Sequence, residues 1–381
     1  MKIAMIGQKG IATGAGGVEK HVEKIALGLV KNDYDVTVYY RNTYDNRNSY
    51  THKGIVLKKI KTFNKKSLNA IVYTFKATIS AVAEGFDIYH YHAIGPALFC
   101  FIPKMFKKKV VVTIHGLDWE RGKWGKVAKA ILKLGEKIAG RNADVVITVS
   151  DNLRDYFIEK YKKRNKNNTI FIPNGVDLDK AMEPNLIKQF NLEKDEYSLF
   201  LGRIVPEKGI SYLVDAYKNL NTEKKLVIAG GSSFTDNYYC EIRKSAKDNK
   251  NIIFTGSVSG NLLKELYSNC AFYVLPSEIE GMPLSLLEAL SYGKYCLVSD
   301  IKENAYVVDS DILGKTFRKS DVVDLQNKMN EIIEKKLYEN GALERINIVK
   351  DQYNWNSVIE RTINVYKCLE SELHIVSSKY E

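Results

Sequence analysis

The sequence contains no apolar run of the roughly 18 residues that a membrane-spanning helix requires. Its longest candidate, residues 93–102, is too short and is interrupted by Gly95 and Pro96. The first residues carry neither the long apolar region nor the small-residue cleavage site of a secretory signal. These absences predict a cytoplasmic protein whose attachment to the inner face of the cell membrane, if any, is peripheral.

Cysteine is scarce and dispersed, with five residues in a chain of 381 and no CxxC pair. Such a set predicts reduced thiols that serve mainly as small core residues, and it gives no sign of a zinc site. We therefore expect no metal and no other cofactor. The length favours two domains, and a content of 45% hydrophobic and 27% charged residues is typical of a globular protein.

Positive charge is concentrated in the first half of the chain. Residues 1–180 hold 32 Lys and Arg against 16 Asp and Glu, a net charge of +16, whereas the remaining residues have a net charge of −4. This asymmetry favours an anionic partner for the first half, either a phosphorylated ligand or a negatively charged membrane surface. A lysine-rich surface that is simply solvated explains it equally well.

Short β-branched or aromatic runs alternate with amphipathic stretches, which predicts an α/β protein with parallel, doubly wound sheets. The turn signal Pro173-Asn174-Gly175 interrupts the series, which then restarts. We therefore expect two Rossmann-like domains joined by a hinge at residues 173–180. The expected strands are residues 2–7, 36–40, 88–91, 110–114, 145–149 and 170–172, followed by 198–202, 225–230, 252–256, 271–275 and 295–299.

Ligands of open parallel sheets bind beyond the carboxyl ends of the strands, and two sheets facing each other would place these ends across one cleft. Polar residues just after strands are therefore the functional candidates. The first is a glycine-rich turn that contains Gly16 and Gly17 and precedes a helix at residues 19–31. Its amides suit a phosphate or a sugar. The spacing matches neither GxGxxG nor a P-loop, and a flexible loop is the alternative.

His115 directly follows the expected strand 110–114 and precedes Gly116. Its imidazole is therefore expected to project toward the ligand, where it donates to a sugar hydroxyl or takes part in proton transfer. Asp118, Trp119 and Arg121 in the same loop are candidates for binding an acceptor. Packing of the loop by Trp119 is the alternative.

The loop after strand 198–202 carries Gly202, Arg203 and Lys208 ahead of a helix. Two cations beside a helix N-terminus suit a diphosphate. They would stabilise the charge that develops on a departing nucleoside diphosphate without a metal. A salt bridge from Arg203 to Glu207 within the loop is the alternative.

Two carboxylates follow the strand at residues 271–275. Glu280 precedes a helix that begins near Pro283, and Glu288 falls in an otherwise apolar stretch of that helix. A carboxylate in such a stretch is unfavourable unless it is paired, and a ribose diol offers it two donors. Helix capping by Glu280 and a solvent-facing Glu288 are the alternatives.

Together these residues resemble the retaining glycosyltransferases of family 4, which have the GT-B fold. The similarity covers nearly the whole chain, and a helix after Tyr353-Asn354-Trp355 resembles the C-terminal helix that crosses back onto the first domain in that family. Five motifs carry it in order, namely Gly16-Gly17, His115-Gly116, Ile172-Pro173-Asn174-Gly175-Val176-Asp177, Gly202-Arg203 with Lys208-Gly209, and Glu280-Gly281-Met282-Pro283 with Glu288.

The resemblance implies an acceptor-binding domain at residues 1–175, completed by a helix at about 356–381, and a nucleotide-sugar-binding domain at residues 176–355. It implies no protein nucleophile and assigns catalysis to His115, Glu280, Arg203 and Lys208. Glu288 would bind the ribose, Glu280 and His115 the transferred sugar, and the two cations the diphosphate. The remaining donor-binding positions that it implies are Gly16, Gly17, Gly202, Gly281, Met282, Pro283 and Leu284.

Residues 7–10 and 115–121 resemble members that build capsular, exo- and lipopolysaccharide units, which implies a UDP-linked donor and a glycan or lipid-linked acceptor. The sequence departs from the family at residues 293–296, where proline usually follows Gly293, so the identity of the sugar stays open. A sugar-nucleotide epimerase or a hydrolase on the same fold is an alternative. A nucleic-acid-binding protein is a more remote one, because the pI of about 9.1 fits but no nucleic-acid motif is present.

The lysine-rich residues 58–66 precede an amphipathic stretch. Basic residues beside an apolar face suit an anionic bilayer, and ordinary packing of the helix on its sheet is the alternative. The apolar residues of this stretch are Leu68, Ile71, Val72, Phe75, Ile79 and Val82.

Overall fold

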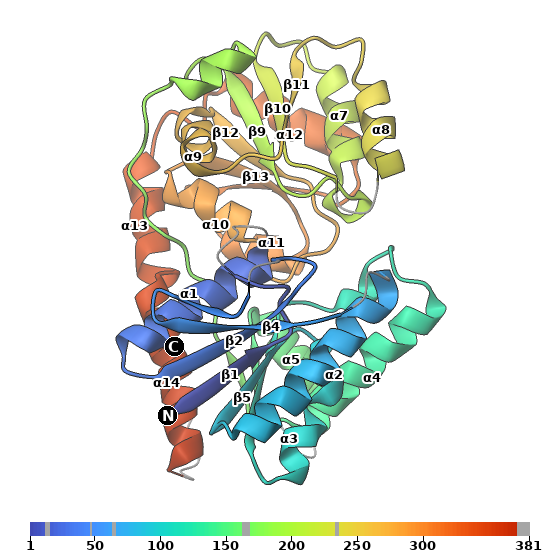
Figure 1. Ribbon diagram of the computed structural model, residues 1–381. Helices are drawn as coiled ribbons and strands as arrows, with labels where there is room; N and C mark the ends of the chain where they lie inside the picture. The colour runs from blue at the N-terminus through green and yellow to red at the C-terminus, as the bar shows by residue number, and fades with distance from the viewer. Residues whose placement is uncertain (12–15, 46–47, 63–65, 162–167, 233–235, 372–381) are drawn as a thin grey trace. The chain divides into compact units, whose positions relative to one another are not determined.

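The computed structural model describes residues 1–11, 16–45, 48–62, 66–161, 168–232 and 236–371. The chain forms two compact units. Unit 1 comprises Met1–Gly175 and Trp355–Glu381, and unit 2 comprises Val176–Asn354. Each unit is built on one sheet with helices on both sides (Figure 1).

The sheet of unit 1 has the strand order β3-β4-β2-β1-β5-β6-β7-β8. Its described pairs are parallel except for β3 with β4, which are antiparallel. Central strands such as β5 are buried along their whole length, as expected where helices cover both faces. The strands are β1 (Lys2–Ile6), β2 (Asp35–Arg41), β3 (Tyr50–His52), β4 (Ile55–Ile60), β5 (Ile88–His92), β6 (Lys109–Ile114), β7 (Val145–Thr148) and β8 (Thr169–Phe171).

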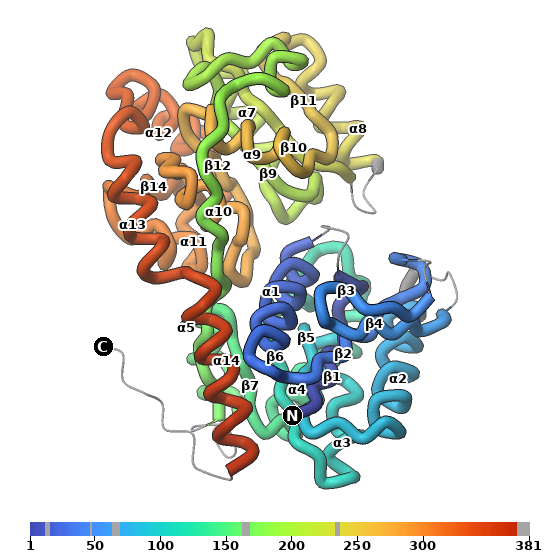
Figure 2. Tube along the Cα trace, turned by 60° about the vertical axis from the view of Figure 1, so that its left-hand side comes forward, coloured from blue at the N-terminus to red at the C-terminus, as the bar shows by residue number. Residues whose placement is uncertain are grey.

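Helices α1 and α14 lie on one side of this sheet, and α2, α3 and α4 lie on the other (Figure 1). The C-terminal helix α14 packs against α1 (Figures 1 and 2), where Ile359 contacts Gly28. The last ten residues of the helix expected at about 356–381 lie outside the described residues. The helices of unit 1 are α1 (Gly17–Lys31), α2 (Lys66–Glu84), η1 (Pro96–Phe99), α3 (Phe101–Met105), η2 (Asp118–Glu120), α4 (Lys126–Asn142), α5 (Asp151–Lys160) and α14 (Trp355–Glu370).

The sheet of unit 2 is parallel and has the strand order β11-β10-β9-β12-β13-β14. Its strands are β9 (Tyr197–Leu201), β10 (Lys225–Ala229), β11 (Ile252–Gly256), β12 (Phe272–Leu275), β13 (Tyr295–Ser299) and β14 (Gly314–Phe317). Its helices are η3 (Leu186–Phe190), η4 (Pro206–Lys208), α7 (Ile210–Lys218), α8 (Asp236–Ser245), α9 (Gly260–Asn269), α10 (Leu284–Ser291), α11 (Lys302–Val307), α12 (Val322–Glu334) and α13 (Ala342–Gln352).

The expected fold class, with two Rossmann-like parallel-sheet domains, is confirmed. Every strand expected from the sequence is present to within one or two residues, whereas β3, β4 and β14 were not expected. The lysine-rich residues 58–60 belong to β4, and Lys58 forms an ion pair of 2.6 Å with Glu84. Residues 63–65 of the same segment lie outside the described residues.

The expected apolar face of α2 is not the face that packs on the sheet. Tyr73, Ala77 and Ala81 are fully buried, whereas Phe75 and Ile79 are 46% and 45% exposed. The buried face combines Tyr73 with the smaller residues Thr74, Ala77, Thr78 and Ala81. No helix in the described ranges has the length and apolarity needed to cross a bilayer.

Gly209 joins η4 to α7 with a φ of +66°, and a β-carbon there would lie 2.0 Å from the carbonyl oxygen of Pro276. We expect Gly209→Ala to lower the free energy of unfolding well beyond the 1–2 kcal/mol, roughly, that left-handed backbone costs an L-residue. Gly256 is the matched control in the same unit, because its φ is +71° and no described atom lies within 4 Å of the added carbon. Equal losses for the two variants in urea denaturation would contradict the steric argument.

Candidate functional site

The candidate donor residues of unit 2 lie in loops that follow two paired strands. β9 and β12 run parallel as neighbours, with Ser198 opposite Phe272. The loops at residues 202–209 and 276–283 therefore leave the sheet at the same edge. This edge is the place where open parallel sheets bind ligands.

Lys208 and Glu280 are brought together at this edge, where the Lys208 Nζ contacts Glu280 Oε1 in an ion pair. The two side chains are 14% and 11% exposed, so the pair is shielded from solvent more than an ordinary surface salt bridge. The amide of Glu278 donates to the carbonyl of Glu207 at 2.9 Å and ties the loops together. The pair excludes the alternative that Glu280 caps α10, since the cap residue is Pro283 and no side chain caps it.

The other residues of the two loops differ in exposure. Gly202 donates its amide to the carbonyl of Ala229 at 3.0 Å, and the Arg203 side chain after it is exposed. Gly281, Met282 and Pro283 are buried, and α10 begins at Leu284. Residues 281–284 therefore form the N-terminal end of α10 and the segment directly before it.

Glu288 lies on α10 among buried leucines and is itself half-buried. Its Oε2 accepts a hydrogen bond of 2.9 Å from the hydroxyl of Tyr267 on α9. Burial and the nearby Glu288 carboxylate raise the pKa of Tyr267 well above its usual value, so the hydroxyl keeps its proton and remains a donor. This partner offsets part of the cost of placing a carboxylate in an apolar helix, and Glu288 is not a fully solvated side chain.

In unit 1, the glycine-rich turn ends at the N-terminus of α1. Gly16 has a φ of +108° and precedes Gly17, the first residue of the helix. The carboxylate of Glu19 accepts a hydrogen bond of 3.1 Å from the amide of Lys9. Residues 12–15 of this turn lie outside the described residues.

His115 lies at the carboxyl end of β6 and beside three other histidines. β5 pairs with β6 in a register that sets His92 opposite Thr113. Nδ1 of His92 therefore reaches Nε2 of His115 at 3.3 Å, and the ring of His21 from α1 lies 4.7 Å from that of His115. The ring of His90 lies behind that of His92, tilted against it, with 4.2 Å between ring centroids.

Burial keeps these four imidazoles neutral. It lowers the pKa of His21 to about 4 and that of His90 to about 3, and it places the pKa values of His92 and His115 well below the usual value. At neutral pH each ring therefore has one nitrogen with a lone pair and one with a proton. Such a histidine can accept or donate a hydrogen bond without carrying charge.

The three residues expected to bind an acceptor have partners within unit 1. Asp118 and Arg121 form an ion pair of 3.4 Å. The indole Nε1 of Trp119 donates to the fully buried Glu136 at 2.6 Å. These contacts support the alternative that Trp119 fixes the loop, and the acceptor role stays a prediction.

Sequence reasoning selected His115 but missed His21 and His92. A signal was available for His92, since His90-x-His92 ends a buried strand and His115 directly follows the next one. His21 gave no signal, because its place depends on how α1 packs over the strand ends. Both neighbours are more deeply buried than His115 itself.

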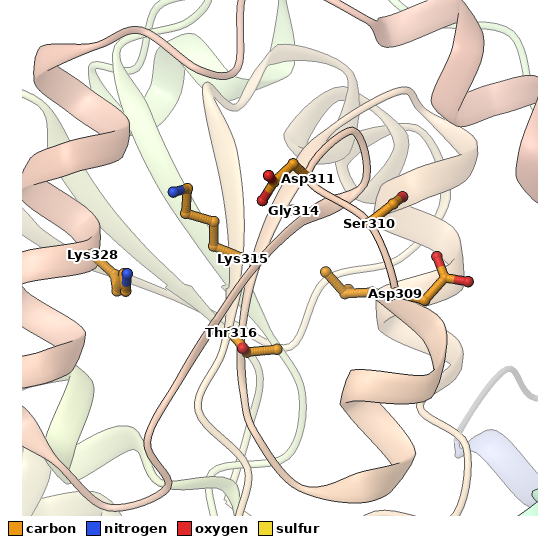
Figure 3. Close-up of a pocket in the computed structure, with 8 residues that line it drawn as sticks. Asp309, Ser310, Asp311, Gly314, Lys315, Thr316 and Lys328 are labelled. Atoms are coloured by element: carbon orange, nitrogen blue, oxygen red, sulfur yellow. The ribbon is translucent and has the colours of Figure 1, made fainter.

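A shallow pocket of about 400 Å³ lies along the edge strand β14 and the segment before it (Figure 3). Its lining includes Asp311, Lys315 and Lys328, and Lys315 forms an ion pair of 2.9 Å with Glu331. Asp309, Ser310 and Asp311 precede β14 and therefore lie at the amino end of this parallel strand. Lys208 and Glu280 lie beyond the carboxyl ends of their strands. None of the residues expected to bind a ligand lines this pocket.

Two family profiles match most of the chain. Residues 15–180 match Glycosyltransferase Family 4, and residues 182–347 match Glycosyl transferases group 1. A glycosyltransferase of Methanocaldococcus jannaschii is 25% identical over 368 residues, which cover 92% of this chain and 94% of the relative. An Escherichia coli UDP-Gal:α-D-GlcNAc-diphosphoundecaprenol α-1,3-galactosyltransferase is 27% identical over 288 residues, which cover 70% and 73% of the two chains.

Solved structures share the architecture. Sucrose-phosphate synthase from Thermosynechococcus elongatus has a TM-score of 0.84 at 20% identity, over 97% of this chain and 99% of that chain. Anabaena HepE in complex with UDP-glucose has a TM-score of 0.79 at 18% identity, over 97% and 100%. At these identities the likeness concerns the fold alone.

Glu136 on α4 is buried and holds the loop that carries Trp119. Besides the indole, its carboxylate accepts from Tyr156, Lys160 and Tyr161 at 3.0, 2.7 and 2.9 Å. We expect Glu136→Gln to lower the free energy of unfolding by about 3 kcal/mol. The amide removes the negative charge that faces Lys160, and its NH₂ group would face side chains that themselves donate hydrogen bonds. The control is Glu159→Gln at an exposed position of α5, which should unfold like the wild type in denaturant. Equal stability of all three proteins would refute a structural role for Glu136.

Proposed function

Because the chain is a glycosyltransferase with the GT-B fold, we propose that it transfers a sugar from a nucleoside-diphosphate sugar, UDP-linked in the first instance, to a glycan or lipid-linked acceptor. The observation that carries the proposal is the ion pair that joins Lys208 and Glu280 from two loops at the carboxyl end of the unit 2 sheet, with Glu288 on the helix that follows the second loop. The relative from Escherichia coli is named for a UDP-sugar and a diphosphoundecaprenol acceptor. A Campylobacter jejuni relative is named for a diphospho-undecaprenol acceptor.

The diphosphate of the donor is assigned to Arg203 and Lys208. Lys208 forms an ion pair with Glu280. An arriving diphosphate competes for the ammonium and leaves the Glu280 carboxylate to accept hydrogen bonds from the hydroxyls of the sugar. Fixed positive charge then stabilises the nucleoside diphosphate as it departs, which is the role that a metal would otherwise fill. We propose a transfer that needs no metal or other cofactor.

The remaining parts of the donor are assigned to the groups around α10 and to the histidine of unit 1. Glu288 accepts from the ribose diol while Tyr267 holds it in place. The backbone at Gly202, Gly281, Met282 and Leu284 closes around the phosphates and the sugar. His115, neutral because it is buried, accepts or donates a hydrogen bond near the carbon that reacts. No side chain is assigned as a nucleophile, and we propose that the configuration of the sugar is retained.

The proposed acceptor belongs to the synthesis of a cell-surface polysaccharide, such as a capsule or lipopolysaccharide. Asp118, Trp119 and Arg121 are proposed to meet it in unit 1, together with the Gly16-Gly17 turn. An epimerase or a hydrolase on the same fold would consume the donor without an acceptor. Product analysis with and without an acceptor separates these activities.

Thermal stabilisation by UDP-, GDP- and dTDP-sugars tests the donor assignment, because a ligand that binds only the native state raises the melting temperature. We expect Lys208→Ala and Glu288→Ala each to weaken donor binding or rate tenfold or more, on the order of 1.4 kcal/mol. Lys264→Ala and Glu196→Ala remove exposed ion pairs of unit 2 and serve as controls that bind like the wild type. Wild-type donor binding in Lys208→Ala or Glu288→Ala would remove the corresponding role.

We also propose that α2 and α3 rest on an anionic membrane. Phe75 and Ile79 on α2 are exposed, as are Met105 and Phe106 at the end of α3, which are 73% and 59% exposed. The lysines at residues 107–109 follow directly. Apolar side chains beside cations suit the interface of an anionic bilayer.

Sedimentation with vesicles that contain an anionic lipid tests this surface. We expect binding that weakens at high salt, and a loss of most of it when Met105 and Phe106 are both replaced by serine. The control is Leu343→Ser, which changes an apolar residue of unit 2 that is 71% exposed. Equal binding by the double variant, or binding that salt leaves unchanged, would refute the proposal.

A further inference from the structure

Three histidines of unit 1 are grouped as ligands of a metal ion would be. His21 comes from α1, His92 from the end of β5 and His115 from the residue after β6. One ring nitrogen from each lies within 4.8 Å of the other two. We propose that these three imidazoles bind a divalent first-row transition metal ion, with zinc as the physiological candidate.

The distances between the nitrogens suit such an ion. Zinc binds imidazole nitrogen at about 2.0–2.1 Å, so two nitrogens in a tetrahedral site lie about 3.3 Å apart. Nδ1 of His92 and Nε2 of His115 are separated by 3.3 Å. The third nitrogen needs to approach by about 1.5 Å to complete the site, which a modest rotation of a side chain provides.

The tautomer of His21 is already set for coordination. Its Nδ1 lies 2.9 Å from Oδ1 of Asn174, and an amide oxygen can only accept a hydrogen bond. The proton therefore resides on Nδ1, and the lone pair resides on Nε2. Histidine ligands of metals commonly donate their second nitrogen to an oxygen in this way, which fixes the ring and raises its basicity.

His92 has a ring nitrogen that the protein does not satisfy. Its Nε2 is buried and has no hydrogen-bond partner in the described part of the chain. A buried polar atom of this kind is costly in a native protein. The nitrogen that faces His115 is Nδ1, so the ion would take the lone pair of Nδ1 and the proton of the ring would reside on Nε2, whose burial the ion does not relieve.

The surroundings favour a site with three protein ligands. His90 is not available as a fourth ligand, because Tyr366 and Thr113 occupy its two nitrogens at 2.6 and 2.7 Å. His115 is the least buried of the three, and a water molecule on that side would supply the fourth position.

Binding of the ion would regulate the enzyme. This step rests on the proposed function, because it assigns His115 to the donor sugar. A lone pair given to zinc cannot accept a hydrogen bond from a sugar hydroxyl, so the ion and the donor compete for the same ring. We expect zinc to inhibit transfer reversibly, with activity restored by a chelator.

Titration of the metal-depleted protein with Co²⁺ tests the site directly. The chain must carry no histidine tag, which would bind the ion itself. We expect one Co²⁺ per chain with the visible absorption of a four-coordinate ion, and displacement of Co²⁺ by Zn²⁺. X-ray absorption at the zinc edge of the wild type should count three imidazole nitrogens. No stoichiometric binding, or a first shell without imidazole, overturns the proposal.

Variants locate the ion within the cluster. His21→Gln and His92→Gln should each weaken Co²⁺ binding by more than tenfold, and Asn174→Ala should weaken it about tenfold through the orientation of His21. The control is His52→Gln, which changes a histidine of unit 1 that lies 3.7 Å from Glu23. Circular dichroism verifies that each variant is folded. If a variant is not folded, the Co²⁺ absorption and the zinc-edge X-ray absorption of the wild type decide whether the ion is bound by imidazoles.

Wild-type affinity in both His21→Gln and His92→Gln overturns the assignment of the ligands. The titration uses no donor and no acceptor, so its failure leaves the proposed transferase activity intact. Conversely, a protein that binds one Co²⁺ through three imidazoles but consumes no nucleotide sugar contradicts the proposed function and not the metal site.

Discussion

Parallel pairing of neighbouring strands is the constraint on which both candidate sites depend. Because β9 and β12 run side by side in the same direction, the loops that follow them leave at one edge. Lys208 and Glu280, which are 72 positions apart, can then form a shielded ion pair. The pairing of β5 with β6 has the same effect in unit 1, where it brings His92 beside His115. In both units, residues that are distant in sequence meet because their strands end together.

The two edges use charge in opposite ways. Unit 2 holds a lysine that is paired with one glutamate and a second glutamate that accepts a hydrogen bond from a tyrosine. Unit 1 has many basic residues in its sequence, but beneath its surface it holds a cluster of uncharged imidazoles. A neutral interior of this kind favours hydrogen bonding and coordination over ion pairing.

Positions along the chain could be predicted from the sequence, whereas partners could not. His115 directly follows a strand, and Lys208 and Glu280 lie in the loops after strands. Hydrophobic patterning locates strands well when they are buried on both faces. The strands β3, β4 and β14 were missed because none of them forms a continuous apolar run: β3 has three residues, β4 contains two lysines near its end, and β14 begins with Gly314 and Lys315. Partners such as Tyr267 for Glu288 and Glu136 for Trp119 come from separate helices. No periodicity within one segment specifies how two helices approach each other.

The route of the chain through the two units affects the order in which they can complete folding during synthesis. Gly175 packs against the indole of Trp355, and residues 176–354 are thus inserted between two parts of a single unit. The hydroxyl of Tyr366 is the partner of His90 in the centre of the first sheet. Domains usually fold in order as they leave the ribosome. Here unit 2 can finish folding during synthesis while unit 1, although it was begun first, still lacks helix α14. A premature stop codon near the end of the message would therefore damage the core of unit 1.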